Sequence, residues 1–272
     1  MSVYSKALYN LRQSIAYALD DCVVCRVDAN ATTSTCANAT LLKADDYYNG
    51  YDCRFYLGTH KDVTREVTDF VKSTGTVTFA PVVTNATDTT DYFELHRRFS
   101  TSQYNDAINR AIEMGKDEYL LDKKDETATL VTDTYEYAVP SGFRYISQIY
   151  REDTTDDDTY YVQNLIDSRK WWVVPVNATN SVIKFADNMY PIGSDLNGQK
   201  LRIIGQQLQS NLTNDADTCL LPSEFVIQQA RAILLSQEKG SDERQAKFAQ
   251  DRADAERRRM VIPPKGIPVF EI

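Results

Sequence analysis

Apolar residues recur at helical spacing in three separate parts of the chain, and the clearest pattern lies in residues 99–121. Its apolar positions follow the i, i+3, i+4, i+7, i+8 spacing of one buried stripe: Tyr104, Ala107, Ile108, Ala111 and Ile112. Ser100 and Gln103 stand at the positions of a capping box, and Phe99 and Tyr104 at those of a hydrophobic staple. The sequence therefore predicts a helix that begins near Ser100.

The other two helical patterns lie near the two ends of the chain. Residues 4–19 carry one apolar stripe, which Asp20 and Asp21 end. Residues 225–235 are apolar on nearly all sides, which is typical of a helix buried on several faces. The continuation, 243–259, is mostly charged and has only a thin stripe of small side chains. Such a stripe is too narrow to hold a helix firmly on its own subunit.

Between the helical segments the period changes to short alternating runs, which are typical of strands. Residues 22–95 contain runs such as YDCRFYLG and GTVTFAPVV, with turn signals at Asn49-Gly50 and 73–75. Residues 127–207 contain runs such as KWWVVPV and KLRIIGQQ. Several short strands at this spacing indicate compact barrels or sandwiches.

These patterns predict an α+β fold. We expect a small helical bundle built from the N-terminal, central and C-terminal helices, with two inserted antiparallel β barrel- or sandwich-like blocks. The predicted segments are an N-terminal helix in 1–21, a first β-rich insertion in 22–98, a central helix in 99–126, a second β-rich domain in 127–210, a C-terminal helix in 211–260 and an extended arm in 261–272. Each helix carries an apolar stripe and has no helical neighbour in sequence, so we expect the three to pack together.

The arm, 261–272, is apolar and extended because Pro263, Pro264 and Pro268 exclude a helix. An exposed apolar arm usually has a docking groove, and we predict that this one docks outside its own subunit's core. The predicted interface residues are Val261, Ile262, Ile267, Val269, Phe270, Ile272, Arg257 and Arg258. The alternative is that the arm folds back to cover the last helix, since apolar arms dock in cis as well as in trans.

Composition narrows the range of functions. The net charge of −9 argues against a general nucleic-acid binder, which needs a basic surface to displace counterions. No apolar run approaches the roughly 20 residues that a membrane span requires. The N-terminus lacks the basic-then-apolar pattern of a signal peptide, so we do not expect translocation by that route.

Four of the five cysteines could in principle form a zinc site: Cys22, Cys25, Cys36 and Cys53. They begin with a C-x-x-C pair, but the second pair of a zinc knuckle is missing. The run CVVCRV also fits a strand in which Cys22 and Cys25 point to opposite faces. We therefore expect reduced, buried thiols without metal. A disulfide is the remaining alternative, and a reducing cytoplasm opposes it.

The sequence has no recognisable catalytic signature. Its two histidines, His60 and His96, lie in no metal-ligand spacing or triad context, and GxSxG, HExxH, Walker and GxGxxG motifs are absent. The acidic stretch 152–158 lacks the Gly and the final Glu of a calcium loop. We predict a protein without enzymatic activity or cofactor. Two alternatives stay open: a glycosidase, whose two acids leave no signature, and a sugar-binding platform at Trp171 and Trp172.

Several segments spread over residues 41–237 are similar to one protein family in their order along the chain and in their general residue pattern. They include LLKADDYYNGYDCRFYLG, VTDFVKSTGTVTFAP, YFELHRRFSTSQYNDAINRAIEMGKD, YEYAVPSGFRYISQIYRED, LRIIGQQ and LPSEFVIQQARAILLSQ. In these segments the chain resembles tailed-bacteriophage virion proteins of the head–tail connector or adaptor (neck) type. Adaptors of this kind are typically built on a small helical bundle, which agrees with the three predicted helices.

The resemblance implies a structural protein that assembles as a ring, of twelve copies, between portal and tail. The implied partners are other copies of the chain, the portal protein and the next neck or tail protein, with packaged DNA in the lumen as a further candidate. The implied location is the virion neck, after synthesis in the host cytoplasm and without a membrane. The alternative within the same setting is a peripheral neck or tail protein with a carbohydrate-binding role.

Overall fold

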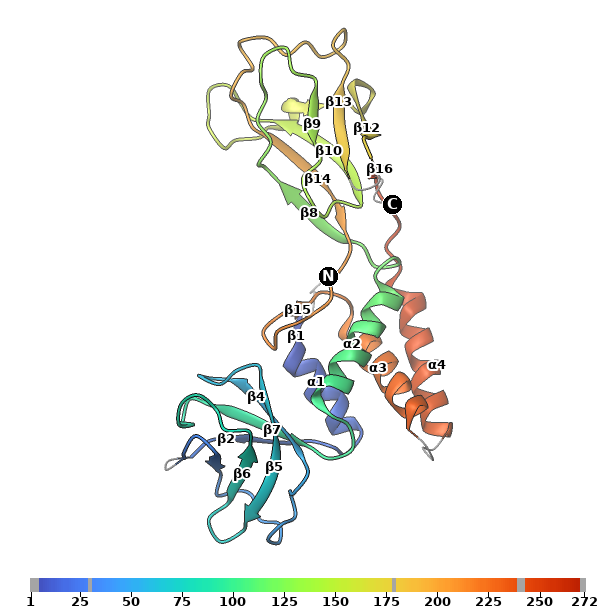
Figure 1. Cartoon of the computed structure of the whole chain (residues 1–272). Helices are drawn as coiled ribbons and strands as arrows, with labels where there is room; N and C mark the ends of the chain where they lie inside the picture. Colours follow the sequence, from blue (N-terminus) through green and yellow to red (C-terminus); the bar gives the residue numbers. More distant parts are fainter. Residues whose placement is uncertain (1–4, 29–30, 178–179, 239–242, 270–272) are drawn as a thin grey trace. The chain divides into compact units, whose positions relative to one another are not determined.

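A computed structural model describes residues 5–28, 31–177, 180–238 and 243–269 (Figure 1). Within these residues the chain forms sixteen strands and four α-helices. It divides into two compact units, each assembled from two segments. Unit 1 comprises Met1–Gly115 and Ser210–Met260, and unit 2 comprises Lys116–Gln209 and Val261–Ile272. The chain therefore passes from one unit to the other three times.

Unit 1 contains a six-stranded antiparallel sheet with the strand order β2-β7-β4-β5-β6-β3. Its strands are β2 (Val23–Arg26), β3 (Thr35–Ala37), β4 (Asp52–Leu57), β5 (Val63–Val71), β6 (Thr76–Ala80) and β7 (Tyr92–His96). The sheet curves into a half-barrel, and its two edges approach where Asp28 N–H donates to the carbonyl oxygen of Ala37 at 2.7 Å. Inward-facing apolar side chains, among them Phe55, Phe79 and Phe93, fill its interior.

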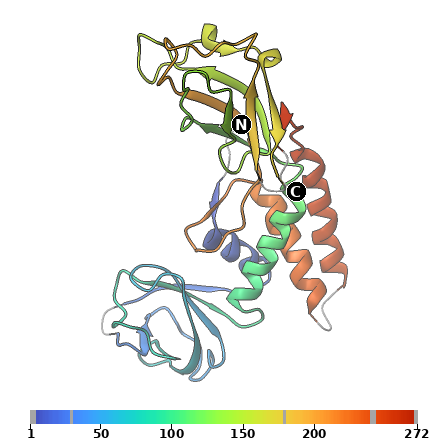
Figure 2. The same ribbon diagram turned by 45° about the horizontal axis from the view of Figure 1, so that its top comes forward.

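All four α-helices of the described residues belong to unit 1. They are α1 (Leu8–Ala18), α2 (Thr101–Gly115), α3 (Ser223–Gln237) and α4 (Glu243–Met260). Helix α2 packs against α1 and α3, α1 also packs against α3, and α4 packs along α3 (Figures 1 and 2). A short ladder of β1 (Lys6–Ala7) and β15 (Thr218–Cys219) precedes α1 and α3.

The predicted start of α2 is confirmed in detail. Ser100 N–H donates to Gln103 Oε1 at 2.8 Å, and Gln103 N–H donates to Ser100 Oγ at 3.3 Å, which completes the capping box. The rings of Phe99 and Tyr104 meet edge to face with their centroids 5.7 Å apart, as the staple requires. The helix ends at Gly115, where an added Cβ would lie 2.5 Å from Phe225 Cε1 of α3. The small residue thus lets α2 and α3 approach closely.

Unit 2 is formed by two antiparallel sheets around one apolar core. One sheet has the order β11-β10-β14-β8, with β16 also pairing with β10, and the other has the order β12-β13-β9. The strands are β8 (Leu121–Asp125), β9 (Glu136–Ala138), β10 (Tyr145–Arg151), β11 (Leu165–Ile166), β12 (Trp171–Pro175), β13 (Ser181–Phe185), β14 (Leu201–Gln207) and β16 (Ile267–Pro268). Two 3₁₀ turns, Val162–Asn164 and Ser168–Lys170, flank β11. Ile149, Ile203 and Phe185 are among the side chains that fill the shared core.

The predicted fold class, a helical bundle carrying two inserted β blocks, is wrong. Most elements are strands in several antiparallel sheets, and the sheets of each unit surround a hydrophobic core of their own. An apolar stripe shows which side of a helix is buried but not what covers it. Helix α1 illustrates the difference, because its buried Arg12 binds Glu94 on the half-barrel. The predicted central segment, 99–126, likewise contains β8 of unit 2 after α2 has ended.

None of the described helices combines the length and the apolar character that crossing a lipid bilayer requires.

Candidate functional site

The described part of the predicted C-terminal arm, residues 261–269, lies on unit 2 of its own chain. Ile262 N–H donates to the carbonyl oxygen of Glu118 at 2.8 Å, and β16 adds to the edge of β10. Val269 is 4% exposed and belongs to the core of unit 2, whereas Val261 is 56% exposed. Residues 261–269 therefore dock in cis, on the edge of β10 and not over the last helix as the alternative from sequence had it. β16 can pair there despite its proline because it is an edge strand.

The other predicted interface residues are divided between the two units. Ile267 is half-buried where it pairs with Ile146 of β10. Arg257 and Arg258 belong to the last turn of α4 in unit 1, with Arg258 exposed. Phe270 and Ile272 lie outside the described residues.

The paired tryptophans of β12 do not form a continuous aromatic platform. Strand alternation turns Trp171 into the core of unit 2 and leaves Trp172 40% exposed. Trp171 and the exposed Val162 also line a groove of about 500 Å³. The indole of Trp172 is thus accessible to a ligand, whereas that of Trp171 belongs to the core.

A network of buried ion pairs joins α1 to the half-barrel of unit 1. Arg12 binds Glu94 of β7 and, through Nη1, Asp215 Oδ1 at 2.7 Å. Arg54 of β4 reaches the other oxygen of Asp215, with Nε 2.9 Å from Oδ2. Asp62 extends the network: its Oδ1 lies 3.1 Å from Arg54 Nη2 and accepts from Asp215 N–H at 2.7 Å. The network therefore connects four chain segments that are distant in sequence.

The charges in this network stabilise one another. Burial by itself would raise the pKa of Glu94, but Arg12 and His96 together outweigh it and hold the pKa below the usual value. Burial opposes the charge of Arg12 as well, yet Glu94 and Asp215 together raise the pKa of its guanidinium. The carboxylate of Glu94 is thus ionised and bound by a cation. Such groups hold a structure together and are not free to act as nucleophile or base.

The two histidines lie in different environments. His60 Nδ1 lies 2.7 Å from Asp91 Oδ2, and His60 N–H donates to Asp91 Oδ1 at 3.0 Å, which fixes the turn after β4 to the start of β7. His96 lies on the face of β7 that is turned away from the barrel interior, against the ring of Tyr104 at 5.1 Å. Burial would lower the pKa of His96, but the interaction with Glu94, whose Oε1 lies 3.4 Å from Nε2, raises it.

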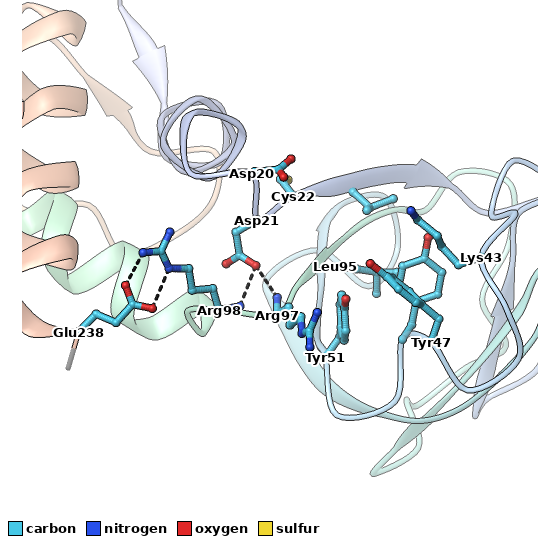
Figure 3. A pocket seen from close by; sticks show the side chains of 12 residues that line it. Asp20, Asp21, Cys22, Lys43, Tyr47, Tyr51, Leu95, Arg97, Arg98 and Glu238 are labelled. Atoms are coloured by element: carbon cyan, nitrogen blue, oxygen red, sulfur yellow. Dashed lines mark hydrogen bonds and ion pairs between the residues drawn. The ribbon is translucent and has the colours of Figure 1, made fainter. Parts of the chain in front are cut away.

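A cleft of about 640 Å³ opens in unit 1 (Figure 3). Arg98 binds Glu238 through two nitrogens, with Nε donating to Oε1 at 2.8 Å. Asp21 accepts the backbone N–H groups of both Arg97 and Arg98 at 2.7 Å, so its carboxylate closes the turn before α2. Three of the acidic and basic side chains at the cleft are therefore already engaged in fixing the chain.

Tyrosine rings line another part of this cleft. Tyr48 meets Tyr47 and Tyr51 edge to face, with centroid separations of 5.1 Å and 5.3 Å. Lys43 Nζ lies 5.1 Å from the centroid of the Tyr47 ring. This surface is suited to contact with an apolar or aromatic group that carries a neighbouring negative charge.

Sequence reasoning missed the buried network because its members are far apart in the chain. A local signal was present in YFELH, where Phe93 and Leu95 point into the half-barrel and Glu94 and His96 point to the opposite face. Both faces of β7 are buried, which identifies Glu94 and His96 as buried polar residues that need partners.

No protein-family model and no curated protein matches this sequence.

Proposed function

We propose that the protein is a structural component of a tailed-phage virion, a head–tail adaptor that forms a ring between portal and tail. Its resemblance to neck proteins, over segments of both units, supports the assignment. The observation that carries it is that the buried charged side chains bind one another. They hold α1 and the half-barrel together through Arg12, Glu94, Asp215 and Arg54. Buried ion pairs of this kind keep unit 1 rigid, and an interface between subunits needs such a rigid surface.

The outer surface of α4 supports assembly as well. This helix packs on unit 1 through a thin stripe that includes Ala249, Ala253 and Met260. Phe248, in contrast, is 58% exposed on a helix whose other outward residues are mostly charged, and Arg252 lies over its ring at 5.4 Å. Aromatic and arginine side chains are enriched at protein–protein interfaces. In a ring, a neighbouring subunit would contact Phe248 and Arg252.

The mass of the particle in solution tests the proposal. The protein is measured by size exclusion with light scattering, alone and after addition of the portal protein. A ring of twelve chains of 30.9 kDa has a mass of about 371 kDa. A species near that mass, or one that forms only with the portal, supports the adaptor. A 30.9 kDa monomer that never joins the portal and is missing from purified virions overturns it.

Exposure of Trp172 favours one second candidate, a peripheral neck or tail protein that binds carbohydrate. A stacked sugar ring needs an accessible indole face, and Trp172 offers one. Titration with host-surface glycans, followed by tryptophan fluorescence, tests this function. A saturable change that disappears in Trp172→Phe supports it, and an unchanged spectrum with every glycan rejects it.

A further inference from the structure

Two neighbouring strands of unit 1 bring three metal-ligating side chains together. Glu94 and His96 lie two residues apart on β7, so they project from the same face. Val23 of β2 pairs with Leu95 of β7, which places Cys22 opposite His96 on that face. One donor atom each from Cys22, Glu94 and His96 lies within 4.8 Å of the other two. Among the described residues this is the one group of three or more such donors.

The imidazole of His96 is oriented as metal-binding histidines usually are. Its Nδ1 lies 2.9 Å from the carbonyl oxygen of Asp21, which can only accept, so Nδ1 carries a proton. In the neutral ring the lone pair is then on Nε2. Histidine ligands typically donate their other N–H to a carbonyl or carboxylate, which fixes the tautomer and the ring.

Two buried polar atoms of this group have no hydrogen-bond partner among the described residues. His96 Nε2 lies 3.4 Å from Glu94 Oε1, longer than an ordinary hydrogen bond, and is left unpartnered. Arg12 occupies Glu94 Oε1, and Glu94 Oε2 is unpartnered as well. Both side chains are almost fully buried. Leaving such atoms unsatisfied is unfavourable, and a shared cation satisfies both.

We propose that Cys22, Glu94 and His96 bind a divalent cation of the zinc type. Thiolate, imidazole and carboxylate are the ligands that zinc takes in proteins. Zinc bonds of about 2.0–2.3 Å hold tetrahedral donors roughly 3.3–3.8 Å apart, so the three atoms need to approach by at most about 1.5 Å. Coordination replaces the thiol proton of Cys22, which leaves to solvent.

The cleft in unit 1 provides the access route. Cys22 is half-buried and lines this cleft beside Asp20 and Asp21 (Figure 3). A cation can therefore reach the group from solvent, and water completes its coordination. The ion links the residue before β2 to β7, and through the contacts of Asp21 and Arg12 it also braces the start of α2 and the middle of α1. This site goes beyond the proposed adaptor function and does not depend on it.

The sequence predicted thiols without metal because the second cysteine pair of a zinc knuckle is absent. The fold supplies a histidine and a glutamate across a strand pair in place of a second cysteine pair. The competing occupant of the space is a proton on His96 Nε2, shared with Glu94 as a buried ion pair. Metal binding and this proton exclude each other, so an experiment can decide between them.

Cobalt titration of the full-length protein is the test. The protein is stripped with a chelator, dialysed and titrated with Co²⁺ while the absorption spectrum is recorded. We expect one equivalent to produce a thiolate-to-cobalt charge-transfer band and tetrahedral d–d bands, both abolished by Zn²⁺. Cys22→Ser should lose the charge-transfer band. Cys25→Ser should keep it, because Cys25 belongs to the half-barrel core.

The melting temperature is a second readout, which distinguishes loss of metal binding from a folding defect in the variants. Zn²⁺ should raise the melting temperature of the wild-type protein but not that of Cys22→Ser or Cys22→Ala, because a ligand that binds only the native state stabilises it. Failure of the wild-type protein to bind Co²⁺ overturns the proposal and favours the proton-sharing pair. A band that persists in both Cys22 variants overturns it too.

Discussion

Arg12 Nη1 and Asp215 Oδ1 lie 2.7 Å apart, with both side chains buried, and join residues 203 positions apart in the chain. The same guanidinium binds Glu94, so one side chain neutralises two carboxylates. The stability of unit 1 therefore depends on Arg12 more than on any exposed ion pair of the chain, because a buried charge without its partner is strongly unfavourable.

Replacement of Arg12 tests this dependence. Arg12→Met should lower the free energy of unfolding by about 3–5 kcal/mol, since Glu94 loses its buried cation and Asp215 keeps only Arg54. Urea unfolding followed by far-ultraviolet circular dichroism reports on unit 1, which contains the four described helices. Arg259→Met is the matched control within unit 1: its ion pair with Glu256 lies on the surface of α4, and we expect a loss below about 1 kcal/mol. Equal losses in the two variants would contradict the role of Arg12.

The C-terminal arm offers a matched pair of substitutions at two valines. Val269→Asp should destabilise unit 2 by roughly 3 kcal/mol or more, because it places an unpaired charge in the core. Val261→Asp should change the stability by less than about 0.5 kcal/mol, since its side chain faces solvent. Both tryptophans lie in unit 2, so their fluorescence follows its unfolding. If Val269→Asp unfolds like the wild-type protein, the arm does not dock in cis.

The carboxyl group of Asp217 predicts a specific pH dependence of the stability of the protein. Its Oδ2 accepts from the backbone N–H groups of Asn214 and Thr213 at 2.8 Å and 2.7 Å, and these bonds lower the pKa of the carboxyl group. Because the folded pKa lies below the unfolded value, the stabilisation is complete above the unfolded pKa of about 3.9 and is lost as the pH falls through the folded pKa.

We therefore expect Asp217→Asn to be less stable than the wild-type protein at pH 7, by about 1 kcal/mol for this partly exposed group. The difference between the two proteins should shrink as the pH falls below about 3.9, because the wild-type carboxylate then begins to take up a proton. Urea unfolding at pH 7 and pH 2.5 measures it. Asp251→Asn, at an exposed position of α4, serves as the control and should match the wild-type protein throughout. A difference that stays constant with pH would rule out this role of Asp217.

Phe248 tests the ring proposal at a defined surface. Phe248→Glu should reduce the assembled particle to the 30.9 kDa subunit, because a charge replaces an aromatic contact between subunits. The melting temperature of the subunit should not change, since the side chain is exposed. Leu42→Glu, at another exposed apolar residue of unit 1, should leave the particle intact. Loss of the particle in both variants would point to general damage and not to an interface on α4.

The parts of the fold that could be predicted from sequence depend on neighbours within one or two turns of chain. Ser100 and Gln103 are three residues apart, so the cap of α2 needs no knowledge of the rest of the molecule. The alternating runs indicated strands for the same reason. The partner of each element is a long-range property. A stripe on α1 predicts burial, but it does not reveal that Arg12 meets Glu94, 82 residues away.

The candidate sites show the same limit. The sequence identified an apolar arm in 261–272, yet its docking on β10 depends on a free strand edge that only the assembled sheet reveals. Cys22, Glu94 and His96 fit no metal motif, because motifs record spacing along the chain. Their proximity arises from the register of β2 on β7. A search for cross-strand pairs of donor residues would have found them.

Each unit is built from two segments of the chain. During synthesis on the ribosome, unit 1 therefore stays incomplete until its second segment has been made. Arg12 emerges 203 residues before Asp215, which at 5–20 residues per second corresponds to roughly 10–40 s. During that time α3 and α4 are also missing, so the apolar face of α2 is uncovered. The nascent chain therefore exposes both an unpaired guanidinium and an apolar helix surface, the kind of surface that chaperones bind.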